Sequence, residues 1–212
     1  MYDAVEVPTP RAVDVRRTHP FASVLLALSF TLAPISASAS GASHLVPQTT
    51  RPWTGNALTV RVRELWHAIR SNDVAQAGAL FFPRSAYIHL KAIFDPAADF
   101  QYRLWAFYLM DLAAYHAATV HAGAFVGDRI NFADISWIPP GDCENRIGYW
   151  HLPGVRLLYR QGNTIRSVGV FSFISWRGVW YVVHLGPNPR PANVGTVDAP
   201  ALGAGVPGGG GC

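Results

Sequence analysis

The hydrophobic pattern of this chain changes its period near Gly123, and this change constrains the fold more than any other feature. Before that point, apolar residues recur every three to four positions, which is typical of amphipathic helices. After it, they alternate at every second position, which is typical of strands. Helices followed by a run of strands predict an α+β fold, with the helices on one face of an antiparallel sheet.

Three helices are predicted before Gly123, over residues 57–70, 74–82 and 99–119. In the first, Val62, Leu65, Trp66 and Ile69 lie on one face. Asn72 and Asp73 end that helix and can cap the next. Residues 87–94 (YIHLKAIF) have alternating, β-branched character but also fit a helix, so their state stays open.

Four strands are predicted after Gly123, near residues 129–138, 146–160, 165–175 and 178–185. The tripeptides at 161–163 (QGN) and 176–178 (WRG) are typical of tight turns between them. On the last strand, Val179, Tyr181 and Val183 share the face expected to form the core. Residues 186–212 are rich in proline and glycine and predict an extended or disordered tail.

The amino-terminal region has the pattern of a bacterial secretory signal. Arg16 and Arg17 precede an uncharged stretch whose apolar centre, residues 21–32, is shorter than the ~20 residues that span a membrane. Small residues at 37–39 (ASA) predict cleavage after Ala39. An uncleaved anchor and an ordinary core helix are the alternatives. Acidic residues within 1–15 are unusual in a signal, which suggests the hypothesis that translation starts nearer Val13 or Val15 and that most of this part is not translated.

The domain organisation follows from these boundaries. We expect a signal peptide over 1–39, a linker over 40–56, one domain over 57–185 and a tail over 186–212. The predicted location is outside the cell, in the medium or the cell envelope. No second stretch approaches transmembrane length, so no stable membrane anchor is expected.

Charge and motifs narrow the expected partners. The net charge is +4, but the arginines are scattered, so no nucleic-acid partner is predicted. Motifs for nucleotides, zinc proteases and serine hydrolases are missing from the sequence, and no cofactor is expected. His116 and His121 are five residues apart, on different faces of a helix, so no metal site is predicted.

The two cysteines, Cys143 and Cys212, favour a disulfide bond in an exported protein. The glycines at 208–211 form a flexible tether that lets Cys212 reach many surface points. Two free thiols, or pairing between chains through Cys212, remain alternatives.

The order of elements and two quoted segments carry a family resemblance. The helix over 57–70, the short SNDVAQAGALFF helix, a long helix and a meander that ends in WRGVWYVVHL resemble the NTF2-like fold of SnoaL and ketosteroid isomerase. The segment from Cys143 to Pro191 also resembles uncharacterised exported proteins of high-GC Gram-positive bacteria. The resemblance implies a cone-shaped α+β fold with a pocket, and it hosts both enzymes and binding modules.

In such a cone, polar groups that face the pocket perform the chemistry. Tyr108, Asp111 and Tyr115 lie on one face of the long helix, where a carboxylate raised in pKa by burial can act as a general base. The alternative is that Asp111 caps a helix or pairs with an arginine such as Arg103.

The strands add four candidate ligand-binding residues with polar rings: Tyr149, His151, Tyr181 and His184. Aromatic walls with a few polar groups suit a small apolar ligand. The alternative is a tryptophan-rich core with satisfied histidines. Three functions therefore stay open: a non-catalytic module that binds a small ligand or an envelope component, an isomerase- or hydrolase-type enzyme with Asp111 as base, and a structural envelope protein.

Overall fold

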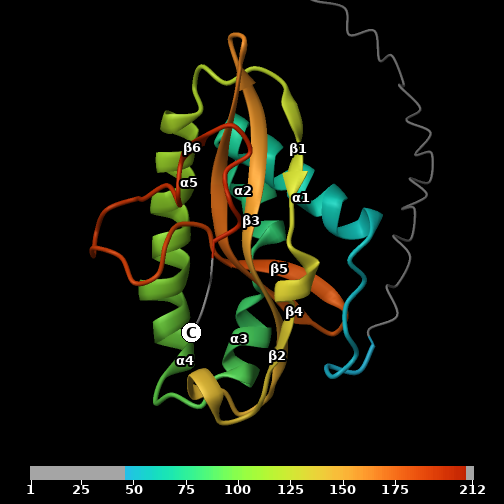
Figure 1. The fold of residues 1–212 in the computed structure, drawn as a ribbon. Coiled ribbons are helices and arrows are strands. Elements are labelled where there is room, and N and C mark those ends of the chain that lie inside the picture. Colours follow the sequence, from blue (N-terminus) through green and yellow to red (C-terminus); the bar gives the residue numbers. More distant parts are fainter. Residues whose placement is uncertain (1–45, 209–212) are drawn as a thin grey trace, which may run out of the picture. The chain divides into compact units, whose positions relative to one another are not determined.

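The computed structural model describes residues 46–208. Within them the chain is an α+β fold in which helices come first and an antiparallel sheet follows (Figure 1). The sequence-based prediction of an α+β fold is therefore confirmed. The signal segment, the cleavage site after Ala39 and Cys212 lie outside the described residues, so those predictions stay predictions.

Three helices open the fold: α1 (Asn56–Ser71), α2 (Val74–Leu80) and α3 (Arg84–Leu90). The face of α1 expected to be apolar is buried, as the spacing predicted. The Asp73 carboxylate accepts hydrogen bonds from the first free N–H groups of α2, at 2.9 and 3.0 Å, and so caps it as expected. The segment 87–94 is helical only as far as Leu90.

The long helix predicted over 99–119 is a continuous run of three parts: α4 (Pro96–Asp99), the π-helical turn η1 (Phe100–Trp105) and α5 (Ala106–Ala118). Asp95 caps its first turn. Short π-helical turns inside α-helices occur frequently at functional sites. Here η1 carries Arg103 and Leu104, which both contribute to the site described below.

The described part of the chain forms a six-stranded antiparallel sheet. Its strands are β1 (Phe125–Arg129), β2 (Ser136–Ile138), β3 (Tyr149–Gln161), β4 (Thr164–Trp176), β5 (Val179–His184) and β6 (Ala201–Leu202). The order is β1-β3-β4-β5, while β2 pairs with β3 and β6 with β4. The prediction of one strand over 129–138 is wrong. A 3-10 turn, η2 (Phe132–Asp134), breaks that segment into two strands, because Asn131 caps the turn.

The C-terminal segment, residues 186–208, packs on the sheet and on α5 (Figure 1). Its irregular course agrees with its prolines and glycines, and of the two predicted alternatives, an extended or a disordered tail, the packed course of residues 186–208 excludes the disordered one for this part. Arg156 of β3 is 1% exposed and donates to the carbonyl of Ala199 at 2.6 Å and to Ser167 at 2.7 Å. Close packing at Gly169, whose N–H donates to the Asp198 carbonyl at 2.8 Å, fixes the segment against β4.

The described end of the predicted linker, residues 46–55, also lies against the sheet. The Gln48 side chain donates to the carbonyls of Gly148 and Ser175 and accepts from the N–H of Arg177. The indole of Trp180 donates to the carbonyl of Trp53 at 3.2 Å. These contacts hold the chain beside the β4–β5 turn before α1 begins.

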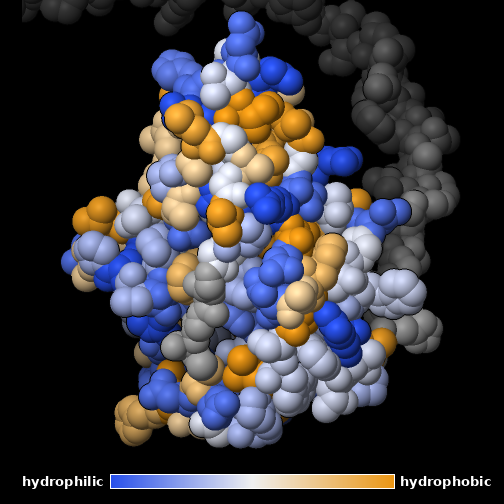
Figure 2. All heavy atoms as spheres, viewed as in Figure 1, coloured by the Kyte–Doolittle hydropathy of each residue, from blue (hydrophilic) through white to orange (hydrophobic). Residues whose placement is uncertain are grey.

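The face on which the C-terminal segment lies carries both hydrophobic and hydrophilic side chains. Figure 2 shows hydrophobic residues gathered below the tip of the β3–β4 hairpin, with hydrophilic residues between them and smaller apolar clusters further along. Exposed apolar side chains of this segment include Leu202 and Val206. The largest apolar surface of the fold is internal, in one core shared by the helices and the sheet.

Candidate ligand-binding site

A cavity of about 680 Å³ lies between the helical layer and the sheet. Its helical wall comes from α3, the loop after α3, α4 and η1, and its sheet wall from β2, β3, β4 and β5. Asn188 of the C-terminal segment adds a further part of the lining. The volume falls within the ~300–1,000 Å³ that is usual for small-molecule sites.

The sheet side of the cavity is its buried end, and its polar groups come from three neighbouring strands. His151 lies on β3, Ser172 on β4 and His184 on β5. The Nε2 atom of His151 is 2.8 Å from the Ser172 hydroxyl, and both residues are buried. Burial lowers the pKa of His151 to about 4. Both the ring and the hydroxyl are therefore uncharged at neutral pH.

A β-bulge in β5 brings both Val183 and His184 to the cavity. Phe173 pairs with Val182 but Ser172 pairs with His184, so Val183 is an extra residue on its strand. In a regular strand, consecutive side chains point to opposite faces. The bulge changes the direction of the strand locally, and bulges of this kind are frequent next to binding sites. Both side chains consequently line the cavity.

The helical side of the cavity is more exposed and carries charge. The Asp99 carboxylate accepts two hydrogen bonds from the Arg103 guanidinium, both at 2.6 Å, and a short one from the Tyr87 hydroxyl. Burial alone would raise the pKa of Asp99, but these hydrogen bonds outweigh it and lower the pKa. The pKa of Tyr87 is raised by burial and by Asp99, so its hydroxyl stays protonated.

The loop after α3 is fastened to the β2–β3 connection beside the cavity. Lys91 donates from Nζ to the carbonyl of Cys143 at 2.7 Å, and the N–H of Ala92 donates to the carbonyl of Glu144 at 2.7 Å. Cys143 itself lines the cavity. The predicted bond to Cys212 involves a residue outside the described range, so it stays a prediction.

Three of the residues expected to bind a ligand line this cavity: Tyr149, His151 and His184. Sequence reasoning missed Tyr87, Ser172 and the Asp99–Arg103 pair. The spacing of Asp99 and Arg103, four residues apart on a helix, was a visible signal for an ion pair. Nothing local distinguished Ser172, because only the strand register brings it beside His151.

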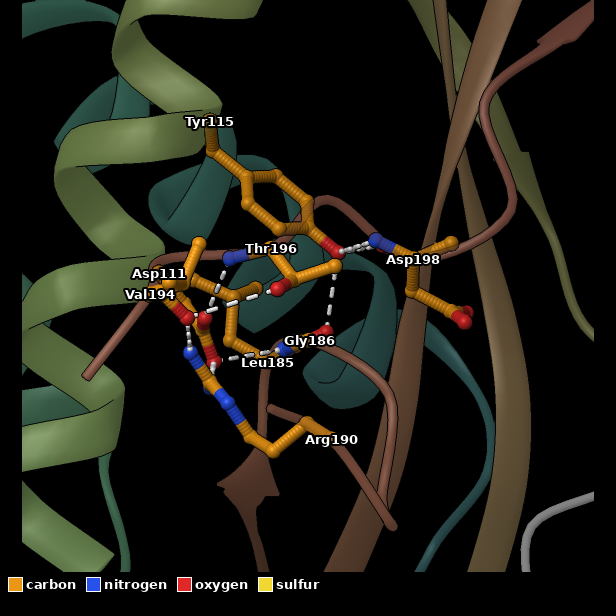
Figure 3. Close-up of polar contacts among 9 residues, drawn as sticks. Asp111, Tyr115, Leu185, Gly186, Arg190, Val194, Thr196 and Asp198 are labelled. Atoms are coloured by element: carbon orange, nitrogen blue, oxygen red, sulfur yellow. Dashed lines mark hydrogen bonds and ion pairs between the residues drawn. The ribbon is translucent and has the colours of Figure 1, made fainter. Parts of the chain in front are cut away.

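Asp111, the candidate general base, does not line the cavity. Its carboxylate accepts hydrogen bonds from the N–H of Gly186 at 3.0 Å and of Thr196 at 2.9 Å, and it pairs with Arg190 (Figure 3). Burial raises its pKa, against the effect of these donors. The alternative that Asp111 pairs with an arginine is confirmed, but that arginine is Arg190 and not the suggested Arg103, which binds Asp99.

The other tyrosine candidates also have structural roles. The Tyr108 hydroxyl donates to the carbonyl of Ala77 at 2.9 Å, which joins α5 to α2. The Tyr115 hydroxyl lies 2.7 Å from the carbonyl of Gly169. It also accepts a hydrogen bond from the N–H of Asp198 at 2.9 Å (Figure 3). Burial raises the pKa of both hydroxyls, which therefore stay protonated.

Tyr181 lies outside the cavity, with the guanidinium of Arg61 4.7 Å from its ring centroid. The expectation that its face of the last strand forms the core is largely wrong. Trp180 and Val182, on the opposite face of β5, are 2% and 0% exposed and so are the more deeply buried residues.

Residues 46–208 contain no group of three or more histidine, cysteine, aspartate or glutamate side chains arranged to hold a metal ion. No helix in this part of the chain has the length and apolar character needed to cross a membrane.

Comparison with known proteins gives no match for this chain. No protein-family model, no curated protein and no solved structure matches it. The function of the protein is therefore inferred from its α+β fold and from the geometry of the cavity.

Proposed function

We propose that this protein is a non-catalytic binding module that holds a small, largely apolar ligand in the cavity between its helices and its sheet. The observation that carries the proposal is the composition of the lining. Its apolar walls include Leu90, Leu104, Ile138 and Ile174, and the polar groups at the buried end are His151, Ser172 and His184. The charged side chains of the lining come from the helical side and the β2–β3 connection: Lys91, Asp95, Asp99, Arg103 and Glu144. Apolar walls with few, fixed polar groups are the usual design of small-molecule sites.

Binding is favoured over general-base catalysis by the state of the polar groups. A general base works best when its pKa is near the operating pH. The pKa values of His151 and His184 are lowered to about 4, chiefly by burial, so both imidazoles are weak bases. Asp111 is engaged by three donors away from the cavity.

A purely structural role is disfavoured by the cavity itself. A protein selected only to occupy the cell envelope has no need of a lined cavity whose volume lies in the range usual for small-molecule sites. Two of the polar groups of the cavity, His151 and Ser172, also hold each other in place through a hydrogen bond.

We further propose that the fold is NTF2-like and that the protein acts outside the cell. The NTF2-like proposal is supported by the sequence resemblance, by helices preceding a meander of antiparallel strands, and by a cavity between the two layers. The export proposal rests on the pattern of residues 16–39, which predicts a cleaved signal.

Titration with a fluorescent apolar probe tests the binding proposal. We expect 1-pyrenebutanol to bind with 1:1 stoichiometry by fluorescence and native mass spectrometry. Val183→Phe extends a ring into the cavity and should weaken binding at least tenfold. Val60→Phe makes the same change on the exposed surface of α1 and should not. Equal binding by the two variants, or no binding by the wild-type protein, would contradict the proposal.

A further inference from the structure

Three polar side chains from three neighbouring strands form one cluster at the buried end of the cavity. Ser172 and His184 are opposite each other in the register of β4 and β5, and both line the cavity. Residues that are opposite in an antiparallel pair lie side by side on one face of the sheet. His151 reaches Ser172 from β3, on the other side of β4, with its Nε2 atom 2.8 Å from the hydroxyl. A ligand that enters this end therefore meets all three groups together.

The cluster has hydrogen-bonding capacity that the described part of the protein leaves unused. The ring nitrogens of His184 have no hydrogen-bond partner within residues 46–208, and its described ring contact is an edge-to-face one with Phe171. An uncharged imidazole has one donor and one acceptor, and a hydroxyl has one donor and two acceptor sites. His151 uses one of the sites of Ser172 and leaves the others. This end of the cavity can therefore both donate to a ligand and accept from it.

The charged side chains of the lining lie elsewhere, on the helical side and on the β2–β3 connection. Three of them are acidic and two are basic, so the lining has no excess of positive charge. The Arg103 guanidinium is bound to Asp99 by two hydrogen bonds of 2.6 Å, and the Lys91 ammonium donates to a backbone carbonyl of the β2–β3 connection at 2.7 Å. Burial lowers the pKa of His151 and of His184 to about 4, so neither imidazole is charged at neutral pH. A charged head group at the buried end would therefore lie beside uncharged groups only.

We infer that the ligand is an uncharged apolar molecule with one hydroxyl group, which lies against His184 and Ser172. Its apolar part occupies the space beside Leu104 and Ile174. This inference rests on the proposed binding function and names the ligand class of the same cavity. A hydroxyl both donates and accepts, so it can pair with an imidazole and with a serine hydroxyl at the same time. A site of this kind rejects an analogue that lacks the hydroxyl, because its own polar groups are then left unpaired.

Ionised head groups are disfavoured because burying a charge without a partner is costly, so such a group has to become neutral before it binds. At pH 7 only about one carboxyl group in 500 is protonated, given an ordinary pKa of about 4.3. Only about one alkylamine in 2,500 is uncharged, given an ordinary pKa of about 10.4. The inferred order of affinity for one apolar body is therefore alcohol, then acid, then amine.

Three pyrene probes of similar size separate these head groups. 1-Pyrenebutanol, 1-pyrenebutyric acid and 1-pyrenebutylamine are titrated into the full protein at pH 7. We expect the alcohol to bind at least tenfold more tightly than the acid, and the amine most weakly. If the acid or the amine binds as tightly as the alcohol, the head-group inference is overturned while the binding proposal stands. If none of the three binds, both fail.

Variants assign the recognition of the hydroxyl to the polar cluster. The measured quantity is the ratio of the affinities for 1-pyrenebutanol and for 1-butylpyrene, which has no hydroxyl. His184→Leu should lower this ratio at least tenfold and Ser172→Ala several-fold, whereas His184→Gln, whose amide still donates and accepts, should keep most of it. His67→Leu, on the exposed face of α1, is the matched control and should leave the ratio unchanged. Circular dichroism checks that each variant is folded, and an unchanged ratio in folded His184→Leu or Ser172→Ala would overturn the inference.

The pH dependence of the acid probe tests the exclusion of charge without any variant. Because the acid has to bind in its protonated form, its affinity should rise about tenfold for each pH unit from pH 8 to pH 6, as its protonated fraction does. The alcohol should show a flat profile. The titratable groups around the head group keep their state over this range: His151 and His184 stay uncharged, Tyr87 and Tyr149 stay protonated, and Asp99, Arg103 and Lys91 stay ionised. A flat profile for the acid would mean that it binds as an anion, and it would overturn the inference.

Discussion

Replacing Asp111 by asparagine should destabilise the fold strongly, because this carboxylate fastens the C-terminal segment to α5. The side chains of Asp111 and Arg190 are 2% and 3% exposed. Removing one charge of a buried pair costs about 3–5 kcal/mol, since the other charge is left buried and uncompensated. Arg190 would keep a hydrogen bond from its guanidinium to the carbonyl of Val194 and a contact with the ring of Phe107, whose centroid is 4.6 Å away, but neither replaces a carboxylate.

Urea unfolding followed by tryptophan fluorescence measures this loss. With a slope of about 2 kcal/mol per molar urea, a loss of ~4 kcal/mol lowers the midpoint by about 2 M. Asp99→Asn is the matched control. It breaks an ion pair between side chains that are 22% and 42% exposed, and such pairs contribute about 0–1 kcal/mol.

A double variant keeps the test informative if Asp111→Asn does not fold. Asp111→Leu with Arg190→Leu removes both charges together, and replacing a buried pair by apolar residues is often close to neutral. We therefore expect the double variant to be more stable than either single one. The reasoning is refuted if Asp111→Asn is no less stable than Asp99→Asn, or if the double variant loses the sum of the two single losses.

Two further predictions concern the cavity and the packing of the C-terminal segment. The folded pKa of His151 is about 4, below its ordinary value of 6.5, so stability present above pH 6.5 should be lost as the pH falls towards 4, by about 2 kcal/mol at pH 5. In urea unfolding at several pH values, His151→Gln should remove this part of the pH dependence of the free energy of unfolding, whereas His67→Gln should leave it in place. The same pH dependence in both variants would contradict the prediction. Gly169→Ala places a Cβ 2.0 Å from a carboxylate oxygen of Asp198, so it should cost about 1–3 kcal/mol and speed proteolysis after residue 186. Gly55→Ala, with no atom within 4 Å, is its control, and equal effects of the two would show that the segment is not packed as described.

The parts of the fold that sequence predicted well are those determined by local periodicity. The apolar face of α1 and the capping of α2 by Asp73 depend on residues within a few positions of each other. The strands β3, β4 and β5 have strong alternation and clear turns, so their bounds were nearly right. The error over 129–138 arose because the cap formed by Asn131 overrides the alternating pattern around it.

The site was predicted less well because it depends on contacts between distant parts of the chain. Tyr149, His151 and His184 were named from their residue types, yet their neighbours are set by strand register and by the bulge at Val183. Asp111 was placed correctly on the helix, but its partner is 79 residues away in a segment without periodicity. A residue's type indicates which polar group it carries. Tertiary contacts decide whether that group faces the cavity or is already bound to another part of the protein.

The last part of the cavity lining to be synthesised is in the C-terminal segment. Asn188 completes the lining and Arg190 locks that stretch to α5, and both follow β5 in the chain. Because a polypeptide is made from its amino end, every other wall is synthesised before these two residues. A truncated chain that stops at Gly186 would hold the helices and the long strands but leave one side of the cavity open. On the proposed binding function, a chain that ends before Asn188 should therefore hold its ligand less well than the full chain.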